Sequence, residues 1–134
     1  MGFRMSWTMR LAVLAGLVGA AAPAFAAGMP KHVGQCVSTR VGKVGTRLMD
    51  GSTGQPTPGS GSAIDFANGG YQVSYDQMPA VDASRPGDPV KLCLVSVPKG
   101  CPPGDRRGRM YHATNLRTHG EWTLPDSEHS CGGA

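Results

Sequence analysis

Arg106, Arg107 and Arg109 lie close together in the C-terminal part of the chain, and side chains of this type at this spacing can bind an anion. Each guanidinium group presents N–H donors in a planar fork that matches the oxygens of a carboxylate or a phosphate. The three follow Cys101 and two prolines, so a disulfide and stiff backbone would reduce the entropy lost on binding. A solvated loop in which Asp105 pairs with one of these arginines is the alternative. If the protein has an anionic ligand, we expect it to bind at this loop.

The four histidines raise two further possibilities, a metal site and a general base. The closest approach to a metal cluster in the sequence is the set His119, Glu121, His129 and Cys131. This set lacks the CxxC, HxxxH and HExxH spacings, and a cysteine in a disulfide has no thiolate to donate, so we expect no metal and no cofactor. The general base of a small enzyme would be His129 or His112. The chain has neither a GxSxG motif nor a recognisable pair of catalytic carboxylates, so a non-catalytic protein is the first expectation.

Four aromatic side chains are compatible with a ligand platform or with core packing, namely Tyr71, Tyr75, Tyr111 and Trp122. They alternate with polar neighbours, which is the pattern of side chains that face a core. We therefore expect core packing for all four.

The first 26 residues have the pattern of an export signal. Arg4 and Arg10 precede an apolar run over residues 11–22, and the small side chains of Ala24 and Ala26 suit a signal peptidase. The run is too short to span a bilayer as a helix, which takes about 20 residues. We expect cleavage before Ala27, a periplasmic or extracellular location, and no membrane span.

The charge of the chain argues against a nucleic-acid partner. The full sequence has a net charge of +4, and part of it leaves with Arg4 and Arg10 of the signal. No long run of Lys and Arg with interleaved aromatic residues follows, so we expect an envelope protein or an anionic ligand as the partner instead.

All four cysteines lie beyond the signal, in even number, as expected for disulfides in an oxidising compartment. Four cysteines allow three pairings. A bond between Cys93 and Cys101 would constrain the unfolded chain least. We favour Cys36–Cys93, which would join the first strand to the central one, together with Cys101–Cys131, which would dock the tail beside the arginine loop.

Short alternating segments bounded by glycine and proline predict strands. The segment 35–48 also has apolar residues at helical spacing, but its internal glycines favour a strand with a bulge or bend. Asn68 and Gly69 predict a tight hairpin turn. Apolar residues at both parities of 89–97 predict a central strand that is covered on both faces near its middle. The predicted strands are residues 35–48, 62–67, 71–76, 89–97, 109–118 and 121–125.

These elements predict an all-β domain over residues 27–134, a small disulfide-stapled sandwich or barrel of five or six short antiparallel strands. The strand order stays open at this point. Residues 50–61 are rich in Gly, Pro and Ser and predict a flexible loop. The tail from residue 126 has no large apolar side chain, so we expect Cys131 alone to tie it down.

Three stretches, GDPVKLCLVSVPKGCPPGDRRGRMY, ATNLRT and LPDSEHSCGGA, resemble small exported bacterial proteins of unknown function. The resemblance implies a periplasmic or secreted setting and a framework in which all cysteines are paired. It implies no activity. The functional expectation is therefore a non-catalytic binding or inhibitor module, and the alternative is a small hydrolase-like enzyme of the envelope with a histidine base.

Overall fold

The computed structural model describes residues 2, 19 and 27–133. The predicted export signal lies outside the described residues, apart from Gly2 and Gly19. No helix in the described part of the chain is long and apolar enough to cross a membrane.

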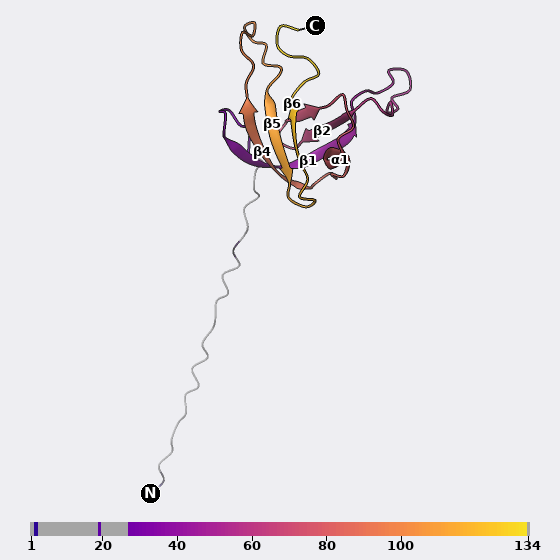
Figure 1. Cartoon of the computed structure of the whole chain (residues 1–134). Coiled ribbons are helices and arrows are strands. Elements are labelled where there is room, and N and C mark those ends of the chain that lie inside the picture. The colour runs from indigo at the N-terminus through magenta and orange to yellow at the C-terminus, as the bar shows by residue number, and fades with distance from the viewer. Residues whose placement is uncertain (1, 3–18, 20–26, 134) are drawn as a thin grey trace.

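Six antiparallel strands form one sheet that curls into a half-barrel, with the order β3-β2-β1-β4-β5-β6 (Figure 1). The elements are β1 (Cys36–Thr46), β2 (Ser62–Phe66), β3 (Tyr71–Val73), α1 (Pro79–Asp82), β4 (Pro89–Ser96), β5 (Met110–Asn115) and β6 (Glu121–Pro125). The prediction of an all-β fold with five or six antiparallel strands is thus confirmed, and the architecture, for which the sequence allowed a sandwich or a barrel, is a half-barrel made of one curled sheet. The four-residue helix α1 was not predicted.

The curl begins in β1, which changes its partner halfway along its length. Its first half pairs with β4, from Cys36 to Arg40, and its second half pairs with β2, from Val41 to Thr46. The register shifts between Val41 and Lys43, where a bulge adds one residue to the strand. Bulges bend a strand and increase its twist, so this position turns the β2–β3 hairpin over the rest of the sheet. The strand expected over residues 35–48 is confirmed, including the bend.

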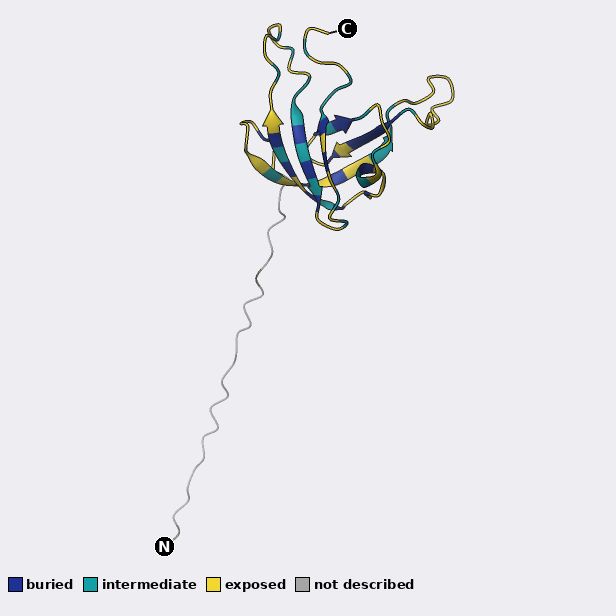
Figure 2. Cartoon of the chain, in the orientation of Figure 1, coloured by how far each residue is buried: buried dark blue, intermediate teal, exposed yellow. Residues whose placement is uncertain are grey.

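The hydrophobic core is built from the strands of the curled sheet and from α1, and Figure 2 marks the buried residues in dark blue. Alternate residues of β4, β5 and β6 point into the core, so that these strands bury one face and leave the other more exposed. The strands β2 and β3 bury neighbouring residues instead, Ser62 to Ile64 and Gln72 with Val73. The buried apolar side chains are Val41, Ile64, Phe66, Val81, Val90, Leu92, Leu94, Tyr111, Ala113, Trp122 and Leu124. Val81 comes from α1, which covers part of the opening that the curled sheet leaves.

A buried glutamine joins the two edge strands of the half-barrel. Gln72 of β3 is 1% exposed, and its amide N–H groups donate to two backbone carbonyls across the core. Its Nε2 lies 2.7 Å from the oxygen of Tyr111 and 3.0 Å from that of Leu124, which are register partners on β5 and β6. The indole N–H of Trp122 donates to Oε1 of Gln72 at 2.8 Å. Side-chain hydrogen bonds thus connect β3 to β6 without a backbone ladder.

A second polar cluster anchors the β5–β6 turn. Asp88 is buried and accepts hydrogen bonds from Arg117, at 2.6 and 2.9 Å, and from the amide of Asn115 at 2.9 Å. Asn115 is fully buried and also donates to Ser84. Because Ser84 and Asp88 lie between α1 and β4, whereas Asn115 and Arg117 lie at the end of β5 and in the turn after it, the cluster fixes the chain after α1 relative to the sheet.

The disulfides join Cys36 to Cys93 and Cys101 to Cys131, which is the favoured pairing. Cys36 and Cys93 are register partners on neighbouring strands, with their Cα atoms 4.0 Å apart. Cys101 and Cys131 link the loop after β4 to the tail, and both segments extend from the same end of the sheet (top of Figure 1). Two disulfides are compatible with an oxidising environment.

Two predictions about burial are wrong. β4 is central, but its convex face is not covered near the middle: Lys91 is exposed, Val95 is 45% exposed, and only Cys93 of this face is half-buried. Tyr75 is 55% exposed, since β3 ends at Val73 and the chain has already left the sheet. Tyr111 and Trp122 pack in the core as expected, and Tyr71 is half-buried.

Two predictions about loops change in detail. Residues 50–61 form an exposed loop, as expected, but hydrogen bonds order its base: Asp50 N–H donates to Gln55 and Thr57 N–H donates to Leu48. Its flexibility stays a prediction. The tail is held by more than Cys131, because Glu128 forms an ion pair with Arg47 at 3.6 Å and further polar contacts join the tail to the arginine loop.

Candidate anion-binding cleft

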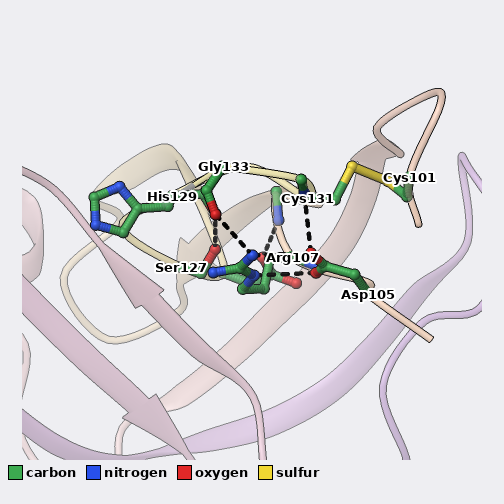
Figure 3. The surroundings of a disulfide bond; sticks show 10 residues. Cys101, Asp105, Arg107, Ser127, His129, Cys131 and Gly133 are labelled. Atoms are coloured by element: carbon green, nitrogen blue, oxygen red, sulfur yellow. Dashed lines mark hydrogen bonds and ion pairs between the residues drawn. A yellow bond between two sulfur atoms is a disulfide. The ribbon is translucent and has the colours of Figure 1, made fainter. Parts of the chain in front are cut away.

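Arg107 stabilises its own loop by binding Asp105 in the loop and the backbone of the tail. Its Nε and a terminal nitrogen donate to both oxygens of Asp105, at 3.0 and 2.8 Å (Figure 3). The same terminal nitrogen donates to the backbone oxygen of Gly133 in the tail at 3.1 Å. The sequence left open whether Asp105 pairs with a neighbouring arginine, and this ion pair answers the question for Arg107.

Backbone groups of the tail also bind this ion pair and its loop. We call the ion pair between Asp105 and Arg107, together with its hydrogen bonds to the tail, the frame. The N–H of Gly132 donates to Asp105 at 3.0 Å, and the N–H of Cys131 donates to the backbone oxygen of Arg107 at 2.9 Å. Together with the disulfide between Cys101 and Cys131, these bonds hold the loop and the tail as one unit. A loop held in this way loses little conformational entropy when it binds a ligand.

The opposite charges of Asp105 and Arg107 stabilise the ionised form of each group. The hydrogen bond from Arg107 and that from Gly132 hold the pKa of Asp105 well below its usual range. The carboxylate in turn raises the pKa of Arg107 above its ordinary value. Both groups are therefore charged at every pH near neutrality. The donors of Arg107 that bind Asp105 and Gly133 are occupied within the protein.

A cleft of about 370 Å³ opens beside this frame. The loop contributes Arg106 and Arg109, and the sheet contributes Tyr71 and Tyr111. The other residues that line it are Met29, Gly69, Gly70 and Asp126. The cleft thus brings together the start of the described domain, the β2–β3 turn, β5 and the first residue after β6.

Arg106 and Arg109 differ from Arg107 in having no intramolecular partner for their guanidinium groups among residues 27–133. Arg106 is exposed and Arg109 is half-buried. Two of the three arginines that the sequence singled out therefore line one cleft, and the third holds the loop in place. Guanidinium groups that face a cleft with their donors free can bind a carboxylate or phosphate bidentately.

The β2–β3 turn forms a wall with little side-chain bulk. Gly69 has φ of +86°, which its place in the hairpin turn requires. At Gly70 a Cβ atom would lie 2.7 Å from the sulfur of Met29, so a side chain there would displace Met29. Met29 thus covers Gly70, whereas nothing lies within 4 Å of a Cβ atom added at Gly69, so a ligand can approach the backbone closely at Gly69.

The histidines lie outside this cleft. Nδ1 of His112 lies 2.8 Å from the hydroxyl of Thr123, and its Nε2 lies 3.9 Å from Glu121, on the convex face of the sheet. His129 is exposed in the tail, and its imidazole points away from Arg107 (Figure 3). Among the described residues, no group of three or more His, Cys, Asp and Glu side chains is arranged to hold a metal ion.

Sequence reasoning missed Asp126, Met29 and the turn glycines as parts of the site. Asp126 follows the last strand immediately, and Arg109 precedes the strand that pairs with it, so a correct hairpin register could have brought these two together. Met29 gave no signal, because its position depends on contacts far away in the sequence. Comparison with known proteins adds no assignment, since no protein-family model, curated protein or solved structure matches this chain.

Proposed function

We propose that the protein is a non-catalytic binding or inhibitor module of the bacterial cell envelope, periplasmic or secreted, which binds an anionic group of its ligand or partner through Arg106 and Arg109. The observation that carries the proposal is the pair of guanidinium groups without an intramolecular partner at one cleft. The export pattern of the sequence and the two disulfides support the location.

The rigidity of the loop supports binding over a merely solvated surface. Arg106 lies between Asp105 and Arg107, whose ion pair is anchored to the tail. Arg109 is anchored through its backbone, because its carbonyl oxygen accepts a hydrogen bond from the N–H of Asp126 at 3.0 Å. A loop whose backbone is fixed before binding loses less conformational entropy than a free loop when its side chains bind a ligand.

The test is an NMR titration of the chain from Ala27 onward with glutarate and, separately, with inorganic phosphate. We expect saturable shifts of the Gly69 and Gly70 amides, which line the cleft. The variant R106Q/R109Q should lose them. The variant R85Q/K91Q removes the same charge from exposed positions elsewhere and should keep them. Equal weakening in both variants, or no saturable shift in the unaltered protein, would refute the proposal.

A small enzyme with a histidine base is the second candidate function. The contact between His112 and Thr123, with Glu121 on the other side of the imidazole, is the observation in its favour. This arrangement lies on an exposed sheet face and is not part of the cleft. A hydrolase screen in which the unaltered protein shows turnover and the H112Q variant shows none, with unchanged folding, would establish this candidate over the first.

A further inference from the structure

The cleft contains a carboxylate as well as two cations. Asp126 lines it, and Oδ1 of Asp126 accepts a hydrogen bond from the N–H of Gly108 at 2.8 Å. No ion pair joins Asp126 to Arg106 or Arg109 within the described part of the chain. A carboxylate accepts about four hydrogen bonds, so Asp126 keeps acceptor sites for a ligand.

This carboxylate makes a simple anion an incomplete match for the cleft. An anion bound at Arg109 lies near Asp126 as well, because these two residues are joined through their backbones at the edge of the β5–β6 hairpin. Two like charges at close range destabilise each other. A ligand that also carries a cation on its other side turns this repulsion into an attraction.

An aromatic side chain of the cleft favours a cation in the same way. Burial, with a contribution from the negative charges of Glu128 and Asp65, raises the pKa of Tyr71. The phenol is therefore neutral at physiological pH. The negative face of an aromatic ring attracts an ammonium group, and the half-buried Tyr71 lines the cleft together with Asp126, whereas Tyr111 is packed in the core.

The size of the cleft fits a small ligand. Pockets for small molecules have volumes of about 300 to 1,000 Å³, and this cleft of about 370 Å³ is at the lower limit. Such a volume accommodates one amino acid or the end of a peptide, and it is too small for a larger folded group.

We propose that the ligand class is an amino acid or peptide terminus with an acidic side chain, which presents carboxylate to Arg106 and Arg109 and its ammonium group to Asp126. This inference rests on the proposed anion-binding function and adds to it the requirement for a cation. The free amino acid and the N-terminal residue of a peptide share this chemistry.

The experiment compares two probes that differ by the ammonium group alone, glutamate and glutarate, in titrations of the chain from Ala27 onward. We expect glutamate to bind about fivefold more tightly, the effect of one partly exposed ion pair. The D126N variant keeps the acceptor for Gly108 and should abolish or reverse this preference, whereas the control D76N, at an exposed position outside the cleft, should retain it. The dipeptide Glu-Gly distinguishes the two sources of the ligand.

The outcomes separate this inference from the proposed function. Glutarate binding as tightly as glutamate would overturn the requirement for a cation and leave anion binding intact. A preference for glutamate that D126N leaves unchanged would equally overturn the role of Asp126. Binding of neither probe would refute the anion-binding function itself.

Discussion

The hydrogen bonds of Gln72 connect the edges of the half-barrel, so replacing this residue should loosen the whole fold. The substitution Q72L keeps a similar volume and removes three hydrogen bonds. The indole N–H of Trp122 then becomes a buried donor without a partner, which costs about 1 to 3 kcal/mol. The carbonyl oxygens of Tyr111 and Leu124 each lose one donor, at about 0.5 to 1 kcal/mol apiece. We expect the free energy of unfolding to fall by about 2 to 5 kcal/mol.

Urea denaturation followed by tryptophan fluorescence measures this change directly. In a chain that starts at Ala27, Trp122 is the single tryptophan, because Trp7 lies in the predicted signal. The fluorescence therefore reports on the site of the substitution, and circular dichroism at the same urea concentrations checks that unfolding is two-state.

The variant W122F provides the control, since it removes the donor that Q72L leaves without a partner. In a double-mutant cycle followed by circular dichroism, the loss in Q72L/W122F should be smaller than the sum of the two single losses by about 1 kcal/mol or more. A Q72L variant within about 0.5 kcal/mol of the unaltered protein, the range of ordinary surface substitutions, would refute the claim that Gln72 joins the edges. Additive losses in the cycle would refute the claim for the Trp122 contact.

Two further predictions concern the disulfide and the buried aspartate. The variant C131S opens a link across 30 residues, so the free energy of unfolding should fall by at most about 3.5 kcal/mol. Hydrogen exchange of the tail and of Arg106 should accelerate by more than that of β4, whose exchange follows the global stability alone; equal acceleration of the tail, the loop and the sheet would contradict this. Asp88 has a pKa well below the ordinary value because of its hydrogen bonds from Arg117 and Asn115, so its contribution to stability is complete above pH of about 4 and declines as the pH falls through its lower folded value. The difference in unfolding free energy between the unaltered protein and D88N, measured from urea midpoints, should therefore be largest near neutral pH and shrink in acid. Stability curves of the two proteins that run parallel with pH would contradict the lowered pKa of Asp88.

The parts of the fold that depend on local signals could be predicted from the sequence. Asn68 and Gly69 define a hairpin turn by their own conformational preferences, and the strand on each side follows from alternation. The pairing of the cysteines was favoured because Cys36–Cys93 joins the first strand to the central one and Cys101–Cys131 attaches a tail that has no large apolar side chain. Each of these inferences uses residues that are close in sequence or limited to a few combinations.

The polar interior and the complete cleft could not be predicted in the same way. The alternation of Tyr71, Val73 and Tyr75 places Gln72 on the solvent side, yet Gln72 is buried because β3 is an edge that folds over towards β6. The three arginines were equivalent in sequence. The ion pair with Asp105 and the contact with Gly133 separate Arg107 from the others, and both depend on how the tail returns to the loop.

Signal cleavage and the cleft are connected through the N-terminal segment, which leads to a last prediction. Met29 lines the cleft, and the predicted mature terminus at Ala27 is two residues away. Two residues span at most about 7 Å, so cleavage would create an α-ammonium group within reach of the cleft. At a separation of about 8 Å in water, one charge contributes about 0.5 kcal/mol to the binding of an anion, roughly a factor of two in affinity.

The chain that starts at Ala27 should therefore bind glutarate about twofold more tightly than the same chain with an acetylated N-terminus. This advantage should disappear as the pH rises through the pKa of the α-amino group, about 7.7 to 8.0, because the neutral amine no longer attracts the anion. Titrations at pH 6.5 and pH 9 at low salt measure both effects. Equal affinities of the free and acetylated chains at pH 6.5 would show that the new terminus points away from the cleft, and cleavage would then have no bearing on the ligand.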